Sequence, residues 1–412
     1  MPNEYGTGLY RDVTLATETT YSVQADGPGQ LLRRTNFSGE LNQPQIASSE
    51  ISQDGQLRHA TLGMPGVAVS LSGELSPGSY KSLFASALRS SWTTGVNTGA
   101  ESTFSLAIAG GTGIPTLTYG GGGNFLTDGF KRGDVVRFSG LTGGPAALNG
   151  INLFTTAVTA STITFAPNDA AVAWSAATQA AATLTVVGKK LFIPTRSNQA
   201  PVFFSIEDWQ SDKELSRLFL GCTVGQISMS VAPNGAVSFQ TSLAGRRVVE
   251  AGSRVYASPT AAATTAPVQG VTGKILYQGT MIGYIPSFSL QISQALQPAM
   301  VIDGLSGPPM IAGGMITAQG SIQALLEDDT ITADFLAQND LDLALHLPTN
   351  ALGTADFVNI FLPRARLASP GNRQDSDRLL VRSYTLMGLQ KTSGGAGTAY
   401  DATTIVIQDS QA

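Results

Sequence analysis

The sequence predicts a mainly β protein made of two similar modules in tandem, with a small all-β domain inserted in the first module. A strand, a long loop, a second strand and a helix follow one another from Leu31, and the same order returns near Tyr284. Glycine is frequent, with 46 residues, and Ala, Ser and Thr dominate many stretches, as is typical of all-β proteins rich in turns. An internal repeat of this kind indicates a duplicated folding unit.

The elements of the two modules match in order. In the first module LLRRTNFSGEL and GVAVSLSGELS precede PGSYKSLFASALRSSW, and in the second YIPSFSLQIS and GGMITAQGSIQ precede DDTITADFLAQ. Two further strands follow in each module: LFLGCTVGQISMS and AVSFQTSLAGRR, then FVNIFLPRARLAS and LLVRSYTLMGLQK. This alignment matches Gly73 to Gly320, Phe84 to Phe335, and Leu243-Ala244-Gly245 to Leu386-Met387-Gly388.

The helix of the first module is predicted by Pro77 at its start and by apolar residues at helical spacing behind it. These apolar residues are Tyr80, Leu83, Phe84, Ala87 and Leu88. We expect this helix to cover one face of the sheet.

Changes in composition predict the domain boundaries. Between Trp92 and Lys189 the chain becomes a series of short Gly-, Ala- and Thr-rich strands, which indicates a small β domain inserted into a loop. We expect this domain, roughly Thr103 to Gly188, to project outward and to be dispensable for assembly of the protein. The predicted organisation is an N-terminal arm (1–30), a first module (31–99 and 190–252), the inserted β domain (100–189), a low-complexity linker (253–272), a second module (273–392) and a C-terminal arm (393–412) whose strand from Thr403 could pair with a neighbour.

Composition excludes several classes of protein. A chain of 412 residues with a net charge of −5 and no cluster of Lys or Arg is unsuited to stable nucleic-acid binding. The single Cys222 cannot form an intrachain disulfide and lies in an apolar run, which predicts a buried thiol. No run approaches the roughly 18 apolar residues of a membrane helix, and the N-terminus has no apolar signal region, so we expect folding in a cytosol.

No motif supports catalysis, a cofactor or a metal site. His59 and His346, the two histidines, have no metal-ligand spacing around them. The acidic groups Glu207-Asp208 and Glu327-Asp328-Asp329 fit the ordinary role of acids before a helix better than a paired-carboxylate site. The run from Gly120 to Asn124 lacks the lysine and the strand-to-helix setting of a phosphate loop, and we interpret it as a flexible turn.

Polar and apolar residues alternate clearly in the central strands, so each strand has one dry face and one polar face. The polar positions carry Ser, Thr, Gln and Glu but almost no Lys or Arg: Ser70, Ser72, Glu74, Ser287, Ser289, Gln291, Thr317, Gln319, Ser321 and Gln323. Two interpretations remain open. In the first, the polar face belongs to an ordinary half-exposed antiparallel sheet. In the second, it lines a channel: Lys or Arg side chains there would bind a passing phosphate backbone and slow it, whereas Ser, Gln and Glu would let it slide.

The order of these motifs resembles the tail tube (major tail) proteins of bacteriophages with long non-contractile tails. The resemblance rests on RRTNFSGELNQPQIASSEI, SGELSPGSYKSLFASALRSSW, GCTVGQISMSVAPNGAVSFQTSLAG and ITAQGSIQALLEDDTITADFLA, and it extends from about Leu31 to Gln390. The segment with DGFKRGDVVRFSG and ALNGINLFTTAVTASTITF is similar to an insertion carried by this family.

The resemblance implies a tail-tube-type β-sandwich or barrel with a flanking helix in each module. It implies rings that stack into a hollow virion tail, assembled in the host cytoplasm, through which double-stranded DNA passes. Its implied partners are further copies of the chain and the tape measure, tail terminator and distal tail proteins. Because relatives commonly form sixfold rings of single modules, a two-module chain is expected to form homotrimeric, pseudo-hexameric rings.

The two long loops, about Asn42 to Gly66 and about Gln294 to Gly314, are expected to join stacked rings. They are longer than ordinary hairpin loops and contain apolar residues that a solvent-exposed loop does not require: Ile46, Ile51, Leu57, Met64, Met300, Val301, Ile302 and Met310.

Two other functions compete with the structural one. The first is a carbohydrate- or receptor-binding tail-tip protein, for which the inserted domain offers only Trp174 and Tyr119 as candidate sugar platforms. The second is a hydrolase, which requires a histidine or paired carboxylates converging in a cleft.

Overall fold

The computed structural model describes residues 6–51, 53–99, 103–108, 114–166, 175–302, 306–325, 330–369 and 381–412. Within them the protein is mainly β, as predicted, with three α-helical segments. These are α1 (Lys81–Leu88), α2 (Phe125–Asp128) and α3 (Thr330–Leu336). Glu327-Asp328-Asp329 and Trp174 lie outside the described residues.

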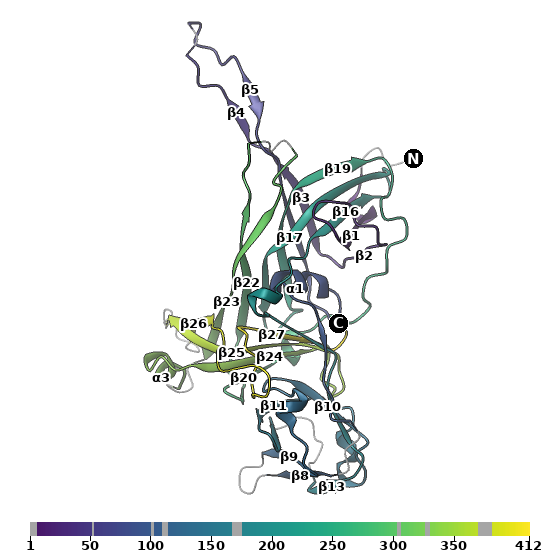
Figure 1. The fold of residues 1–412 in the computed structure, drawn as a ribbon, viewed down its shortest axis with the longest axis vertical. Coiled ribbons are helices and arrows are strands. Elements are labelled where there is room, and N and C mark those ends of the chain that lie inside the picture. Colours follow the sequence, from purple (N-terminus) through teal and green to yellow (C-terminus); the bar gives the residue numbers. More distant parts are fainter. Residues whose placement is uncertain are drawn as a thin grey trace.

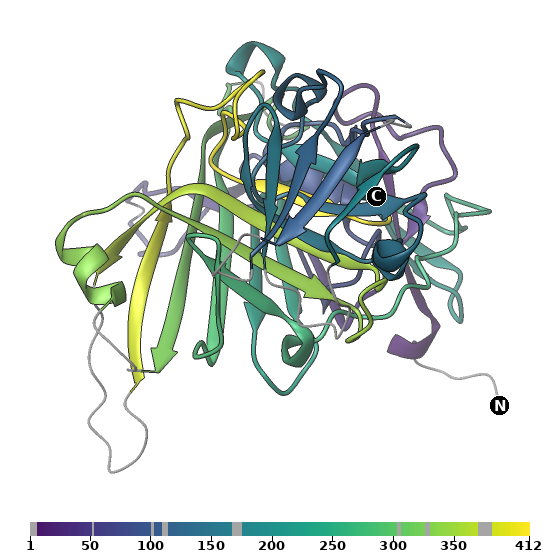
Figure 2. The same cartoon turned by 90° about the horizontal axis from the view of Figure 1, so that it is seen from below.

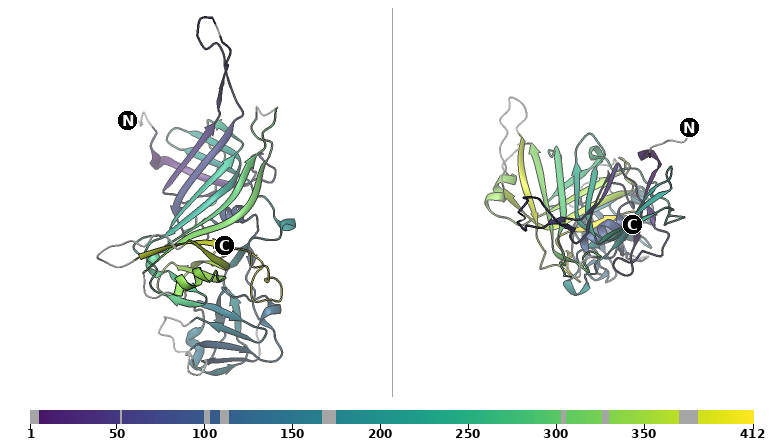
Figure 3. Two further views of the ribbon diagram at one scale, coloured as in Figure 1. Left: turned by 90° about the vertical axis from the view of Figure 1, so that its left-hand side faces the viewer. Right: turned by 90° about the horizontal axis from the view of Figure 1, so that it is seen from above.

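Strands from both modules form one continuous antiparallel sheet (Figure 3). Its order is β3-β6-β18-β17-β22-β23-β26. The strands are β3 (Asn36–Asn42), β6 (Gly66–Glu74), β18 (Ser238–Gly245), β17 (Leu215–Val231), β22 (Ser287–Pro298), β23 (Ile311–Leu325) and β26 (Val381–Gly388). The pairing of β17 with β22 joins the modules through their main chains.

Further strands pack behind this sheet and enclose the core. They are β1 (Arg11–Thr17), β2 (Gln30–Leu31), β7 (Thr93–Thr94), β15 (Lys189–Phe192), β16 (Phe204–Gln210), β19 (Arg247–Ala251), β20 (Lys274–Tyr277), β21 (Thr280–Ile282), β24 (Leu341–Pro348), β25 (Phe357–Ser369) and β27 (Val406–Asp409). Helix α1 packs on β17, and α3 packs on β25. All five apolar residues predicted for the first helix are buried, and Tyr80 stacks on Phe239 with ring centroids 4.1 Å apart.

The start of the first helix differs from the prediction. Pro77 lies in a turn, and α1 begins only at Lys81. Gly78 has a φ of 77°, which a right-handed helix cannot contain. The helix therefore begins after this turn.

Strand register relates the two modules residue by residue. Phe37 lies opposite Leu71 as Phe288 lies opposite Ile322. The register also shifts at matching places, between Val224 and Gln226 in the first module and between Leu367 and Ser369 in the second, where the loss of one residue's pairing indicates a β-bulge. The two modules therefore share this irregularity of the backbone as well as their regular strand pairing.

One predicted correspondence is wrong. Leu243 lies opposite Val69, whereas Leu386 lies opposite Gly320. If Leu243 corresponds to Leu386, the counterpart of Gly320 is Val69 and not Gly73. A glycine alone was too weak a marker to fix the register.

The two predicted long loops are hairpins in the structure. In the first module β4 (Gln45–Ala47) pairs with β5 (Ala60–Leu62), and in the second β22 and β23 pair as far as Pro298 and Ile311. The same number of residues separates Ala47 from Ala60 as separates Pro298 from Ile311. Both hairpins extend to the same end of the molecule (Figure 1).

Neither predicted arm is an arm in the described residues. Strand β1 pairs with β16 and β2, and its Val13 and Leu15 are buried. Strand β27 lies between β15 and β25, with Ile405 and Ile407 fully buried. Short alternating strands near the ends of a chain are apolar enough to enter the core, and the C-terminal strand pairs within its own chain.

The stretch predicted as a linker, residues 253–272, is bound to the first module. Val268 is fully buried, its N–H donates to the Leu75 carbonyl, and its own carbonyl accepts from the Val237 N–H. Arg33 donates to the Thr265 carbonyl at 2.5 Å. The segment is thus an ordered strap across the module.

The inserted region has a sheet and a core of its own. Its sheet has the order β13-β8-β9-β12-β11-β10-β14. The strands are β8 (Phe104–Ile108), β9 (Pro115–Tyr119), β10 (Val135–Ser139), β11 (Leu153–Val158), β12 (Thr162–Phe165), β13 (Ala177–Gln179) and β14 (Thr183–Val186). Its entry and exit are adjacent, because the Gly95 N–H donates to the Gly188 carbonyl at 3.0 Å.

The inserted domain also docks firmly on the main body. The buried Gln408 side chain accepts from the Val135 N–H and donates to the carbonyls of Val135 and Val187. Lys190 pairs with the buried Asp134 at 2.9 Å. In the view from below, the blue strands of the insert lie over the middle of the molecule, and β22, β23 and β26 form one flank (Figure 2).

Candidate functional site

The polar residues of the central sheet line up in rows that cross up to six of its seven strands. Gln291 on β22 lies opposite Gln319 on β23 and opposite Ser228 on β17. Ser228 in turn lies opposite Gln240, and Gln240 opposite Ser72. Because neighbouring residues of a strand point to opposite faces, each row keeps its side chains on one face.

All ten residues predicted for a polar face lie on this one face. They occupy three of the seven strands: Ser70, Ser72 and Glu74 on β6; Ser287, Ser289 and Gln291 on β22; and Thr317, Gln319, Ser321 and Gln323 on β23. The register adds residues that were not predicted, although their strands alternate as clearly: Asn36, Ser38, Gln226, Ser228, Ser230, Ser238, Gln240, Ser242, Ser383 and Thr385. Glu40 and Ser293 lie on the same face, because Glu40 lies opposite Ala68 of β6 and Ser293 lies opposite Gln226 and Thr317. We call all of these residues the polar face.

Hydroxyl groups on the polar face bond to one another across strands. The oxygen atoms of Ser289 and Ser321 are 2.8 Å apart, and those of Ser293 and Thr317 are also 2.8 Å apart. The centre of the face is a shallow concavity of about 330 Å³ lined by residues of β17, β18, β22, β23 and β26. The two hydrogen bonds between side chains occupy four of the hydroxyl groups on the face.

The polar face carries little charge. At its described positions from β3 to β26 the charged side chains are Glu40 and Glu74, and Lys and Arg are absent. On the next strand, β25, Arg366 lies opposite Met387 on the same face and is paired with Asp340 at 2.6 Å. The opposite face of the same strands is dry: Val69, Leu71, Leu290 and Ile292 are nearly fully buried. Burial of this dry face fixes the register and so presents the polar residues to the other side.

The hairpin tips expose apolar side chains. Ile51 and Ile302, which correspond to each other in the two modules, are both fully exposed. Seven of the eight predicted loop residues are exposed, namely Ile46, Ile51, Leu57, Met300, Val301, Ile302 and Met310, and Met64 is half-buried. Leu62 and Met315, which were not predicted, are exposed beside them. Exposed apolar clusters on a soluble fold mark contact surfaces.

Two strands of the continuous sheet have open edges. Among the described residues β3 pairs only with β6, although its counterpart β22 pairs on both sides. The segment from Arg366 to Ser369 of β25 pairs with β26 on one side, and no described strand pairs with its other side. Open edges of this kind are templates for adding a strand from another chain.

The candidate catalytic residues have structural environments. Burial raises the pKa of the Cys222 thiol above its usual value. Glu207 accepts from the backbone N–H groups of Val255 and Tyr256, and Asp208 binds Arg11. His59 is exposed on the β4-β5 hairpin, far from these groups in the sequence. The described residues contain no group of three or more His, Cys, Asp or Glu that could hold a metal.

The glycine run contains a turn at Gly121 and Gly122, in line with the predicted turn, and this turn leads into α2. Strand β9 precedes it, and the Asn124 side chain accepts hydrogen bonds from the N–H groups of Leu126 and Thr127. Asparagine caps a helix N-terminus in this way.

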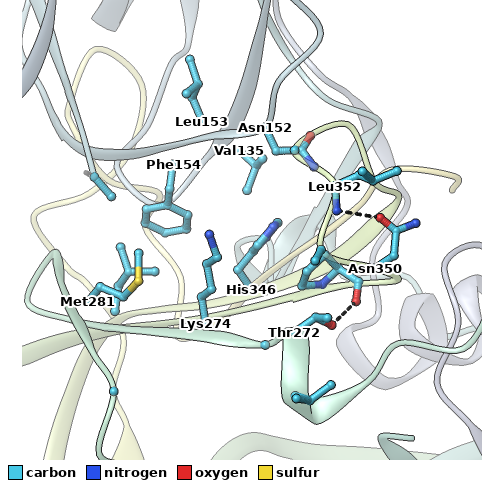
Figure 4. A pocket seen from close by; sticks show the side chains of 18 of the residues that line it. Val135, Asn152, Leu153, Phe154, Thr272, Lys274, Met281, His346, Asn350 and Leu352 are labelled. Carbon is cyan, nitrogen blue, oxygen red and sulfur yellow. Dashed lines mark hydrogen bonds between the residues drawn. The ribbon is translucent and has the colours of Figure 1, made fainter. Parts of the chain in front are cut away.

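A pocket of about 590 Å³ lies between the inserted domain and the second module (Figure 4). Phe154 and Val135 reach it from the insert, and Lys274 and His346 reach it from β20 and β24. His346 is buried against Phe357, and burial, with a smaller contribution from Lys274, lowers its pKa to about 3. Tyr119, a candidate sugar platform, instead packs between Phe104 and Phe125.

A continuous polar-faced sheet with open edges and exposed apolar tips is typical of a structural protein that associates with copies of itself. A model of the phage tail tube protein family matches residues 11–388, and the chain belongs to this family. A search of curated proteins gives no match.

Family membership gives the protein a structural role in the tail of a virion and a place in a self-assembling tube. No described helix is long and apolar enough to span a membrane.

Proposed function

We propose that the chain is the tail tube subunit of a siphophage, and that three chains close a ring around a channel lined by the polar face. Rings stack into the hollow tail, and DNA passes through the channel during genome ejection. The two modules are residues 31–99 with 190–252 and residues 273–392, and the insert decorates the wall.

The observation that carries this proposal is the junction between the modules. The last sheet strand of the first module, β17, pairs with the first strand of the second, β22. The corresponding strands at the two ends of the chain are β25 and β3. The edge of β3 is open, and Ser369, the counterpart of Gln226 and the last described residue of β25, has no partner on that side among the described strands. Repeating the internal junction between chains would pair β25 of one subunit with β3 of the next.

Ring closure then follows from the repeat. A head-to-tail contact either closes a ring or forms an open filament, and closure removes the open edges. If the six modules of a family ring are supplied two per chain, three chains are required. The polar face would continue across each junction, since Gln226 lies opposite Ser293 at the internal one.

The chemistry of the polar face suits the passage of DNA. Each phosphate contacted by Lys or Arg adds salt-dependent binding free energy, which would slow a moving duplex. Neutral Ser, Thr and Gln side chains, with Glu40 and Glu74 and with Arg366 neutralised by Asp340, offer weak attraction or mild repulsion instead. The wall therefore guides DNA without holding it.

Stacking is assigned to the hairpin tips. Both hairpins reach the same end of the molecule and expose Ile51 and Ile302. Burial of such side chains against the next ring would contribute about 1.5 to 3 kcal/mol each. The tape measure, tail terminator and distal tail proteins would contact the tube at its lumen and ends, and assembly would take place in the host cytoplasm.

A disulfide cross-link tests the junction between chains. The internal pair Gln226 and Ser293 corresponds to Ser369 and Asn42, so cysteines introduced by Asn42→Cys and Ser369→Cys in one chain should bond between neighbouring subunits. Oxidised assemblies should then give covalent dimers and trimers and no larger species on a denaturing gel. A matched variant, Ser238→Cys with Ser369→Cys, should give none, because Ser238 lies inside the sheet on β18. Hexamers would contradict the trimeric ring, and failure of all cross-linking in assembled tubes would contradict the junction.

A further inference from the structure

Arg89 joins the two modules at the end of α1. Its side chain donates through Nε to Gln294 Oε1 at 2.7 Å and through Nη2 to the Gly314 carbonyl at 2.6 Å. Gln294 Nε2 in turn donates to the carbonyls of Ser86, at 2.8 Å, and Val224, at 3.0 Å. Arg89 and Gln294 are both buried. These bonds therefore seal the corner where α1 and β17 of the first module meet the β22-β23 hairpin of the second.

The first module has the same corner without an arginine. Because the two hairpins have the same length and strand register, Gln43 corresponds to Gln294. Gly63 corresponds to Gly314 in the same way. Within the chain Gln43 Nε2 donates to the Gly63 carbonyl at 2.9 Å, and the Gln43 side chain stays half-buried. The glutamine and the glycine carbonyl are thus both present beside β3, at the edge of the sheet.

Apolar side chains at the first-module corner are exposed. Leu41 is 46% exposed, whereas Ile292, its counterpart on β22, is fully buried. Leu62, next to Gly63, is 62% exposed. Helix α1 and strand β17 both contact β22 and cover the second-module corner. The first-module corner therefore lacks, within its own chain, the cover that its counterpart has.

Helix α3 ends as α1 does. Arg89 follows α1 and Gln338 follows α3, both in the left-handed conformation, with φ of 49° and 52°. In each case the N–H of this residue donates to the carbonyl three residues before it, and the next N–H donates to the carbonyl five residues before its own. Gln338 therefore corresponds to Arg89. Counted from these ends, the counterpart of Phe84 is Ala333 and not Phe335 as predicted.

The end of α3 lies at the flank opposite β3. Helix α1 lies beside β22, and α3 packs on β25, beyond β26, whereas β3 is the strand at the other end of the sheet (Figure 1). Gln338 is exposed. Leu336 is 73% exposed, although its counterpart Ala87 is buried. In a head-to-tail ring the α3 end of one chain would meet the first-module corner of the next.

The residues at the two corners differ in size in a compensating way. A Cβ on Gly313 would collide with the Arg89 guanidinium, so a residue larger than glycine does not fit beside the arginine. The counterpart of Gly313 is Leu62, and the counterpart of Arg89 is the shorter Gln338. A large side chain beside a short one can fill the space that glycine and arginine fill at the internal corner.

We propose that the end of α3 in one subunit seals the first-module corner of the next. Gln338 Nε2 donates to the Gly63 carbonyl and to Gln43 Oε1, and the freed Gln43 Nε2 donates to the Leu367 carbonyl of the neighbouring subunit. Leu367 corresponds to Val224, the acceptor at the internal corner. The occupant is a second copy of the chain, and this inference rests on the proposed ring junction.

The experiment measures the critical concentration for tube assembly, as the concentration of chain left in solution after tubes are pelleted. Gln338→Ala should raise it about fivefold, the factor that one hydrogen bond of about 1 kcal/mol gives. Gln43→Ala should raise it by a similar factor. The double variant should raise it by less than the product of the two factors, because both residues belong to one contact. Gln269→Ala, at an exposed glutamine of the strap, is the control and should leave it unchanged.

A rebuilt corner provides a second test. Gln338→Arg with Leu62→Gly places between chains the residue types of the internal corner. This double variant should assemble at a lower concentration than Leu62→Gly alone. An equal or higher concentration would overturn the seal.

The remaining outcomes separate the seal from the ring junction. An unchanged critical concentration in Gln338→Ala, or independent effects of Gln338→Ala and Gln43→Ala, would overturn the seal. If cysteines at Asn42 and Ser369 still cross-link in those tubes, the ring junction stands without it. Absence of this cross-link in every assembled tube would overturn the junction and the seal together.

Discussion

Gln226 and Ser293 lie opposite each other where the last strand of the first module pairs with the first strand of the second. Both belong to the polar face, so the face crosses the boundary between modules without interruption. Because strands of the two modules pair through their main chains, the modules form one continuous sheet. The same geometry, repeated between chains, is what the proposed ring requires.

A positive charge placed on the polar face should slow the passage of DNA. Gln291 is exposed at the centre of the face, so Gln291→Lys should leave folding and tube assembly unchanged while adding a phosphate contact from every chain. DNA ejection from virions carrying this variant should be slower than in the parent, and raised salt should restore most of the rate. The control Gln390→Lys adds the same charge outside the polar face. Equal ejection rates for the two variants would contradict the assignment of the channel.

Polar substitution at the hairpin tip should block assembly without unfolding the chain. Ile51 and Leu57 are exposed, so Ile51→Ser with Leu57→Ser should change the free energy of unfolding by less than about 0.5 kcal/mol. Electron microscopy should then show few or no tubes. Leu352→Ser, at an exposed leucine next to the pocket, is the control and should form tubes. Tubes of normal length from the tip variant would refute a stacking role for the β4-β5 hairpin.

The inserted domain should prove to be coupled to the main body through Gln408. Replacing Gln408 by Leu would leave the Val135 N–H and the Val187 carbonyl without the Gln408 partner and would remove one of the two hydrogen bonds to the Val135 carbonyl, at a cost of about 3 kcal/mol. Urea unfolding should show this loss, whereas Gln390→Ala, on the surface, should change little. A loss below about 1 kcal/mol would mean that the insert is joined only loosely and is dispensable, as the sequence suggested.

Acid should destabilise the protein through His346. The pKa of this buried side chain is lowered from 6.5 to about 3, so the unfolded chain binds the extra proton first as pH falls. The unfolding free energy should therefore decrease below pH 6.5, and one such group accounts for about 2.5 kcal/mol by about pH 4.5. His346→Phe should remove this component. His59→Phe, at the exposed histidine, should leave the pH dependence unchanged, and an identical pH profile for all three proteins would contradict the prediction.

The sequence predicted the duplication and the polar face because both depend on local alternation. Strands such as Phe288 to Ser293 alternate strictly, and burial of Leu290 and Ile292 leaves their polar neighbours only one face to occupy. Gln226, Ser228 and Gln240 could have been predicted on the same grounds, since their strands alternate equally well.

Long-range pairing could not be predicted from the sequence. Nothing local distinguishes Val406 to Asp409 as a strand between β15 and β25 from a free C-terminal arm. The glycine match of Gly73 with Gly320 failed for a similar reason, because register depends on cross-strand partners that the sequence does not specify.

A three-dimensional reconstruction of assembled tubes tests the central claim most directly. The account predicts three chains per ring, with six similar modules around the channel, β25 of each chain paired with β3 of the next, and the polar face toward the lumen. Because only the first module carries an insert, each ring should show three protrusions. Six chains or six protrusions per ring, or a lumen lined by any other face of the sheet, would contradict it.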